Sequence, residues 1–171
     1  MIDYNIYSVP NYDRIMKNTI ITLLKQSSKN SIDDEHQKIS WTDWHPSCKI
    51  EEQPYHKYVR SQIINDFVKY FCKKFNRPNK ISIPNLWFQI YKTNDYHKYH
   101  IHSYSHFTNV FYVSLPRKEL KTDILDLEGN KVNLNVKEGE ILTIPAYLLH
   151  RSPVNKFNEE KIIISFNSSF L

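Results

Sequence analysis

Glycine is nearly absent from this sequence, which holds only Gly129 and Gly139 among its 171 residues. A dinucleotide-binding fingerprint and a phosphate-binding loop each need several closely spaced glycines, because the backbone must turn sharply and approach the phosphates. Neither motif can therefore be present, and this excludes most classes of nucleotide-binding enzyme.

Cysteine is equally scarce, since Cys48 and Cys72 are the only two. Two cysteines cannot build a disulfide framework, and Cys72 falls within an apolar helical pattern, so we expect it to be a small core residue. No apolar run is long enough to span a bilayer, and nothing resembles a signal peptide. The sequence favours a reducing cytoplasmic setting without membrane association, which for a viral protein would be the host cytoplasm.

Blocks of like charge are also missing. The 23 lysines and arginines exceed the 18 aspartates and glutamates, which gives a net charge of +5 and an isoelectric point near 9.0. The lysines are scattered, however, and a scattered excess is typical of a solvated surface. The charge permits an anionic partner but does not identify one.

Two helical patterns precede a run of short strands. Apolar residues recur at helical spacing from about 12 to 24 and from about 56 to 76, where Pro78 ends the pattern. Residues 26–55 are polar and irregular, so we expect a long loop there, in which Trp41 and Trp44 either cover a site or pack on the helices. Strands are predicted near 81–83, 86–92, 98–102, 107–114, 121–126, 130–135, 140–144, 148–152 and 161–168.

This order of elements predicts a single domain, residues 1–171. Residues 1–80 would supply helical and loop support, and residues 81–171 would form the β core. Many short strands after two helices favour a mainly β barrel or sandwich that carries a helical face.

Histidines are concentrated in one segment, where His97, His100, His102 and His106 fall within ten residues. Side chains alternate along a strand, so His100 and His102 should share a face. His150 ends a Gly-x5-Pro-x4-His run that reads as a turn, a strand, a proline bend and a further strand. Two ligands on one strand and a third on a distant strand predict an open metal site, and imidazole suits Fe, Zn, Cu and Ni.

The last predicted strand has one apolar face and one mixed face. Its even positions from 162 to 166 are apolar, whereas the other face carries Lys161, Ile163, Ser165 and Asn167. This mixed face points either to solvent or to a polar cavity. The strand near 86–92 alternates in the same way, which is compatible with Gln89 and Tyr91 lining one cavity with the histidines.

The order and spacing of these motifs resemble the Fe(II)/2-oxoglutarate-dependent oxygenases. More narrowly, they are similar to an oxygenase group common in phages and marine bacteria. The resemblance covers about residues 84–168. It is carried by Trp87-Phe88-Gln89-Ile90-Tyr91, His100-Ile101-His102, the aromatic strand Thr108 to Val113, Pro145 to His150, and Lys161 to Asn167.

The resemblance implies a double-stranded β-helix barrel of the jelly-roll or cupin type, backed by the two helices. His100 would be the first ligand of the Fe(II) and His150 the last. His102 stands where the usual facial triad has a carboxylate, and the resemblance to the narrower group implies that it is a ligand too. The same three histidines would then form the catalytic centre.

The resemblance also implies a binding site for 2-oxoglutarate. Lys161 stands where these oxygenases usually have an arginine, and it would pair with the far carboxylate of this cosubstrate. Tyr91 and Gln89 match a pair that hydrogen-bonds the cosubstrate, and Asn167 shares the parity of Lys161. The expected reaction uses O2 and 2-oxoglutarate to hydroxylate a C–H bond.

Two other classes stay open at this stage. One is a cupin-like metalloprotein without 2-oxoglutarate, and the other is a non-catalytic β-barrel binding module. Lys161 distinguishes among them, because a cupin needs no cation there. The sequence does not specify the oligomeric state or the substrate, which could be a protein side chain, a free metabolite or a modified nucleobase.

Overall fold

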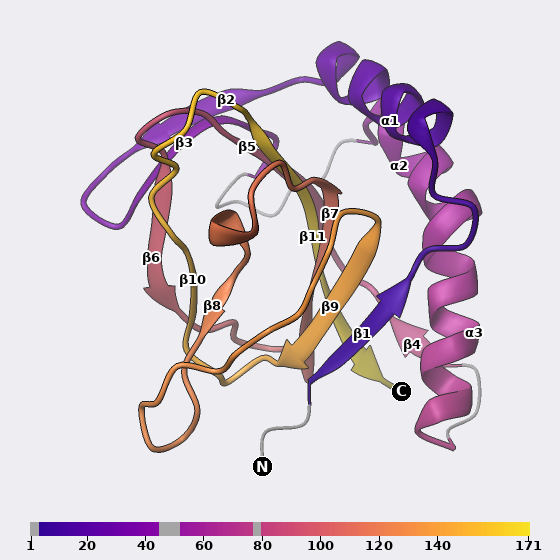
Figure 1. Cartoon of the computed structure of the whole chain (residues 1–171). Coiled ribbons are helices and arrows are strands. Elements are labelled where there is room, and N and C mark those ends of the chain that lie inside the picture. The colour runs from indigo at the N-terminus through magenta and orange to yellow at the C-terminus, as the bar shows by residue number, and fades with distance from the viewer. Residues whose placement is uncertain (1–3, 45–51, 77–79) are drawn as a thin grey trace.

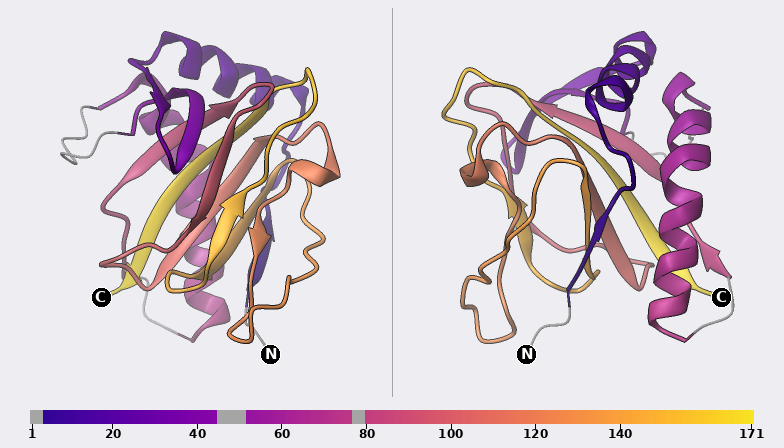
Figure 2. Two further views of the ribbon diagram at one scale, coloured as in Figure 1. Left: turned by 90° about the vertical axis from the view of Figure 1, so that its left-hand side faces the viewer. Right: turned by 45° about the vertical axis from the view of Figure 1, so that its right-hand side comes forward.

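The computed structural model describes residues 4–44, 52–76 and 80–171, and in it these residues build one strongly curved antiparallel sheet with helices on its outer face (Figures 1 and 2). The sheet has eleven strands in the order β1-β9-β7-β11-β5-β3-β6-β10-β8, with β2 paired to β3 and β4 paired to β11. The strands are β1 (Asn5–Ser8), β2 (Asn30–Asp33), β3 (Gln37–Thr42), β4 (Ile81–Ser82), β5 (Leu86–Tyr91), β6 (Tyr96–His100), β7 (Phe107–Ser114), β8 (Asp123–Ile124), β9 (Glu140–Pro145), β10 (His150–Ser152) and β11 (Lys161–Phe170).

The helices form a layer on one side of the sheet. The first is α1 (Arg14–Gln26), which begins after Asp13, whose carboxylate accepts a hydrogen bond from the backbone N–H of Met16 at 2.8 Å. The second predicted helix is confirmed as a continuous run of α2 (Pro54–Val59), a π-helical turn (Arg60–Ile64) and α3 (Asn65–Lys74). A short 3-10 turn, Lys118–Leu120, precedes β8. None of the described helices is long and apolar enough to cross a membrane.

The curved sheet separates two apolar clusters. The outer cluster lies between sheet and helices, where Phe67 of α3 meets Phe166 of β11 edge to face with ring centroids 5.6 Å apart. The inner cluster lies inside the curve and includes Tyr112, Leu142 and Ile163. Burial on both faces explains why the central strands have few exposed positions.

The alternation predicted for β5 and β11 is confirmed. Ile162, Ile164 and Phe166 pack in the outer cluster, whereas the odd-numbered residues from Lys161 to Asn167 line a cavity inside the curve. The antiparallel register sets Lys161 opposite Tyr91 and Ser165 opposite Trp87. The mixed face of β11 therefore points to a cavity and not to solvent.

Three local predictions are wrong. Residues 30–42 are not an irregular loop, because β2 and β3 form a hairpin and β3 pairs with both β5 and β6. The first strand, β1, was not expected from the sequence. No strand spans 130–135, where only Lys131 makes an isolated bridge to Leu125, while Leu134 and Val136 are buried in the inner cluster without forming a ladder.

Cys72 is buried in α3 and forms no disulfide, and Cys48 lies outside the described residues. Burial raises the pKa of the Cys72 thiol, so little thiolate is present at neutral pH. In a Cys48→Ser background, we expect a thiol reagent to label native Cys72 at least 100-fold more slowly than the urea-unfolded chain. Equal labelling rates in the two states would contradict the core assignment.

Candidate metal centre and adjoining pocket

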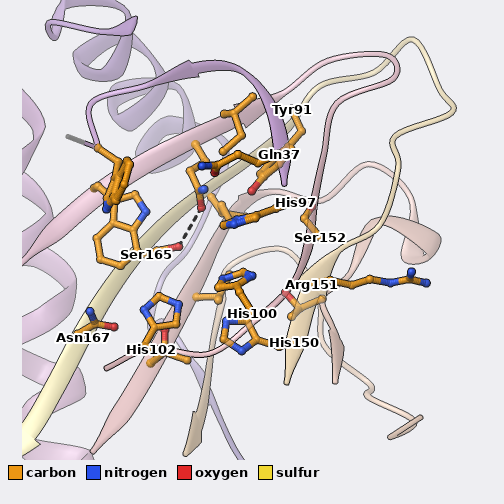
Figure 3. A pocket seen from close by; sticks show the side chains of 18 of the residues that line it. Gln37, Tyr91, His97, His100, His102, His150, Arg151, Ser152, Ser165 and Asn167 are labelled. Carbon is orange, nitrogen blue, oxygen red and sulfur yellow. Dashed lines mark hydrogen bonds between the residues drawn. The ribbon is translucent and has the colours of Figure 1, made fainter. Parts of the chain in front are cut away.

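Three histidines from two neighbouring strands and a loop meet inside the curved sheet (Figure 3). His100 ends β6 and lies directly opposite His150 of β10 in the antiparallel register. His102 follows β6, and its backbone N–H donates to the carbonyl of Ala146 at 2.9 Å, which ties this loop to the turn before His150. One ring nitrogen of each histidine lies within 4.8 Å of the others, so the structure brings the three predicted ligands together.

Backbone carbonyls orient two of the three rings. The Nδ1 atom of His100 lies 2.8 Å from the carbonyl oxygen of Lys98, and Nδ1 of His150 lies 2.9 Å from that of Leu148. A carbonyl oxygen can only accept, so the proton of each ring sits on Nδ1 and the Nε2 lone pair is free. An imidazole held in this way is a typical metal ligand, and the donor set fits a divalent transition metal.

Burial keeps these histidines neutral. It lowers the pKa of His150 to about 3, that of His102 to about 4, and also that of His100. The neighbouring imidazoles lower the pKa of His150 and of His102 further. Metal ligation requires neutral imidazole. The three rings are therefore in the ligating state at pH 7 without having to lose a proton.

A buried cation occupies the other end of the same cavity. The side chain of Lys161 is fully buried, and its Nζ donates to the Ser152 hydroxyl at 2.9 Å and lies 5.1 Å from the ring centroid of Tyr91. No carboxylate forms an ion pair with it among the described residues, and burial lowers its pKa to about 7. The carboxylate of Asp123 raises this pKa only in part, and Asp123 is already paired with Arg151 and Lys131. A buried amine without an anion is costly, which is typical of a binding site for an anionic ligand.

The cavity that joins these two ends has a volume of about 380 Å³. All seven residues predicted for the site line it, namely His100, His102, His150, Lys161, Tyr91, Gln89 and Asn167. Gln89 is held in place by Ser165, whose hydroxyl donates to Oε1 at 3.4 Å. A volume of this size matches small-molecule sites, which are usually about 300–1,000 Å³.

His97 is a cavity residue that the sequence did not single out. Its ring stacks on that of His100 with centroids 3.8 Å apart and an interplanar angle of 13°. On a regular strand, His97 and His100 would face opposite sides. The register pairs His150 with His100 but Ser152 with His97, so an extra residue on β6 rotates His97 onto the cavity face. Because strict alternation puts His97 and His100 on opposite faces, the sequence did not assign His97 to the site. The bulge explains why its ring faces the cavity.

The cavity also has an aromatic end beside His102. The indole of Trp87 stacks on the His102 ring with centroids 5.9 Å apart, and Trp44 lines the cavity at its partly exposed mouth. Trp41, in contrast, packs against the outer cluster. His106 belongs to the histidine run but not to the site, since its Nδ1 accepts the backbone N–H of Phe170 at 3.3 Å.

Comparison with known proteins identifies the fold. No family model and no curated protein matches the sequence, but many solved structures match the fold. An oxidoreductase of the 2OG-Fe(II) oxygenase family from Burkholderia pseudomallei has a TM-score of 0.78 at 9% identity, over 97% of this chain and 85% of that one. The 2-oxoglutarate complex of the viral collagen prolyl hydroxylase from Paramecium bursaria Chlorella virus-1 has a TM-score of 0.62 at 16% identity, over 98% and 96%.

A third similar structure is that of HygX from Streptomyces hygroscopicus with nickel, 2-oxoglutarate and hygromycin B bound. Its TM-score is 0.70 at 8% identity, over 98% of this chain and 83% of HygX. The chain therefore has the double-stranded β-helix fold of the 2OG-Fe(II) oxygenases, as the sequence motifs implied. At these identities the likeness establishes the fold, and the function has to be argued from the site.

Proposed function

We propose that this protein is an Fe(II)/2-oxoglutarate-dependent oxygenase. One observation carries the proposal: a single cavity holds three neutral histidines at one end, two of them oriented by backbone carbonyls, and a buried amine without an anionic partner at the other. A dicarboxylate that chelates a metal with one end and meets a cation with the other would satisfy both features. The similar structures support this reading, because two of them contain 2-oxoglutarate.

Under this proposal, the two ends of the site have different tasks. His100, His102 and His150 would hold Fe(II) through neutral ring nitrogens. Lys161 would bind the far carboxylate of 2-oxoglutarate, with Tyr91 beside it. When bound together, Fe(II), 2-oxoglutarate and O2 would supply an oxidation of a substrate C–H bond that is coupled to decarboxylation of the cosubstrate to succinate.

Gln89 lines the wall between the two ends, and Asn167 lies beside His102; both would supply polar contacts to the bound cosubstrate. The inner cluster supplies apolar residues to the cavity wall, among them Tyr91, Val110 and Ile163. Lys161 also separates this proposal from a cupin-like metalloprotein. A site without a dicarboxylate has no use for a fully buried amine, whose burial costs free energy.

The direct test measures succinate. The purified protein is incubated with Fe(II), 2-oxoglutarate and O2, with and without a panel of candidate substrates, and succinate is quantified. We expect succinate release that requires both the metal and O2 and that increases when a true substrate is present. Failure of the metal-loaded protein to bind 2-oxoglutarate in calorimetry would overturn the proposal.

The pH dependence of cosubstrate binding gives a second test. Burial lowers the pKa of Lys161 to about 7, and only the protonated amine attracts a carboxylate. Above pH 7 the binding of 2-oxoglutarate must therefore take up a proton. The apparent Kd should rise by up to about tenfold for each pH unit above this value, since one pKa unit is 1.36 kcal/mol.

The measurement is calorimetry on the metal-loaded protein between pH 6.5 and 9, in two buffers of different ionisation enthalpy. Lys161→Arg is the matched control, because arginine stays charged over this whole range. Its Kd should be nearly constant with pH. A wild-type Kd that is equally constant, with no proton uptake, would show that Lys161 does not meet the cosubstrate.

A further inference from the structure

The cavity is lined without a single acidic side chain among the residues that the structure describes. Its charged members are Lys161 and Arg151. The side chain of Arg151 points away from the histidines (Figure 3) and donates to Asp123 of the neighbouring strand β8 at 2.9 Å. Asp95 is also occupied, because it accepts the backbone N–H groups of Ser40 and Lys92 at 2.8 Å each.

This lining leaves one positive charge uncompensated when the site is filled as proposed above, and the present inference rests on that function. The two negative charges of 2-oxoglutarate balance a divalent metal ion. The far carboxylate keeps Lys161 protonated, and no ligand is anionic because His102 stands in the place of a carboxylate. A net charge in a buried, low-dielectric site is costly, so the site favours one more anion.

The lining that suits that anion is at the aromatic end of the cavity. Lys161, Ser152 and Tyr91 occupy the cosubstrate end. The opposite end, beside His102, is lined by the indoles of Trp44 and Trp87 and by the amides of Asn85 and Asn167. Indoles provide apolar surface, and amides can donate hydrogen bonds to an oxyanion.

We propose that the substrate of this site is a small organic anion. Its oxyanion group lies beside the metal and His102, where it neutralises the excess charge, and its apolar or aromatic body packs on Trp87 and Trp44. His102 is thus a specificity-determining residue as well as a metal ligand. A carboxylate at this position would remove the charge that selects the anion.

The test compares two probes of nearly the same shape, benzoate and its neutral amide, benzamide. The protein is loaded with Ni(II), which imidazole binds well and which prevents turnover, and is saturated with 2-oxoglutarate before each probe is titrated by calorimetry. We expect wild type to bind benzoate at least tenfold more tightly than benzamide. In His102→Asp the preference should disappear, because the carboxylate cancels the excess charge.

A second variant covers the case in which His102→Asp fails to fold or to bind metal. Asn167→Asp keeps all three histidines and adds the negative charge beside them, and it should also abolish the preference. Equal affinities for the two probes in wild type, or a preference that survives in a metal-binding variant, would overturn the inference. The preceding titration of 2-oxoglutarate separates the two proposals, because absence of cosubstrate binding refutes the oxygenase function itself.

Discussion

Lys161→Ala should weaken the binding of 2-oxoglutarate by at least two orders of magnitude and leave metal binding unchanged. The amine is fully buried and donates only to Ser152, so a carboxylate that meets it forms a buried ion pair. Loss of one partner of such a pair costs about 3–5 kcal/mol, and every 1.4 kcal/mol is a tenfold change in Kd. Calorimetry with the metal-loaded variant measures the change directly.

Lys161→Arg is the companion variant for this experiment. Arginine restores the positive charge, although its planar fork needs more room than the amine, so we expect partial recovery of cosubstrate affinity. Ni(II) titrations of both variants give the metal affinity, which should equal that of wild type. If Lys161→Ala binds 2-oxoglutarate as tightly as wild type, the amine has another role and the cosubstrate site has been misplaced.

His150→Ala should abolish specific binding of a divalent metal at micromolar concentration. His150 is almost completely buried, and its Nε2 is one of three lone pairs that can reach one ion. Replacement of residues that merely orient a ligand typically costs about 10–100-fold in metal affinity, so loss of the ligand itself should cost more. Equilibrium dialysis with Ni(II) or anaerobic Fe(II) measures the effect.

His106→Ala is the matched control, because this histidine belongs to the same sequence cluster but bonds to the backbone of β11. It should bind one metal ion with wild-type affinity. Circular dichroism of both variants verifies that the sheet is intact. Stoichiometric, tight metal binding by His150→Ala would rule out the three-histidine centre.

The alternation of side chains along the strands made much of the site predictable. Alternation on β5 and β11 placed Gln89, Tyr91 and Lys161 on one face, and strict pairing of β strands preserves such a pattern. The His-x-His spacing predicted that His100 and His102 lie together, although β6 ends at His100 and His102 is positioned by the bond from its backbone N–H to Ala146. These are short-range regularities, and they can be read from the chain without knowledge of its neighbours.

The missed features depend on contacts between distant parts of the chain. β3 has only Ile39 and Trp41 as an alternating apolar pair, and it becomes a strand because β5 and β6 flank it. His97 reaches the cavity through a bulge whose position is set by pairing with β10. Residues 130–135 were predicted as a strand, but in this range only Lys131 forms a β-bridge.

The place of β3 in the sheet affects when the metal site forms during folding. The sheet runs from β11 and β5 through β3 to β6 and β10, so in this order β3 (residues 37–42) lies between the strand that bears Lys161 and the strands that bear His100 and His150. The paired residues are about 50 residues apart in the sequence for β3 and β5 and about 60 apart for β3 and β6, and such distant pairing forms slowly relative to local structure. We therefore expect tight metal uptake to be among the last events of refolding.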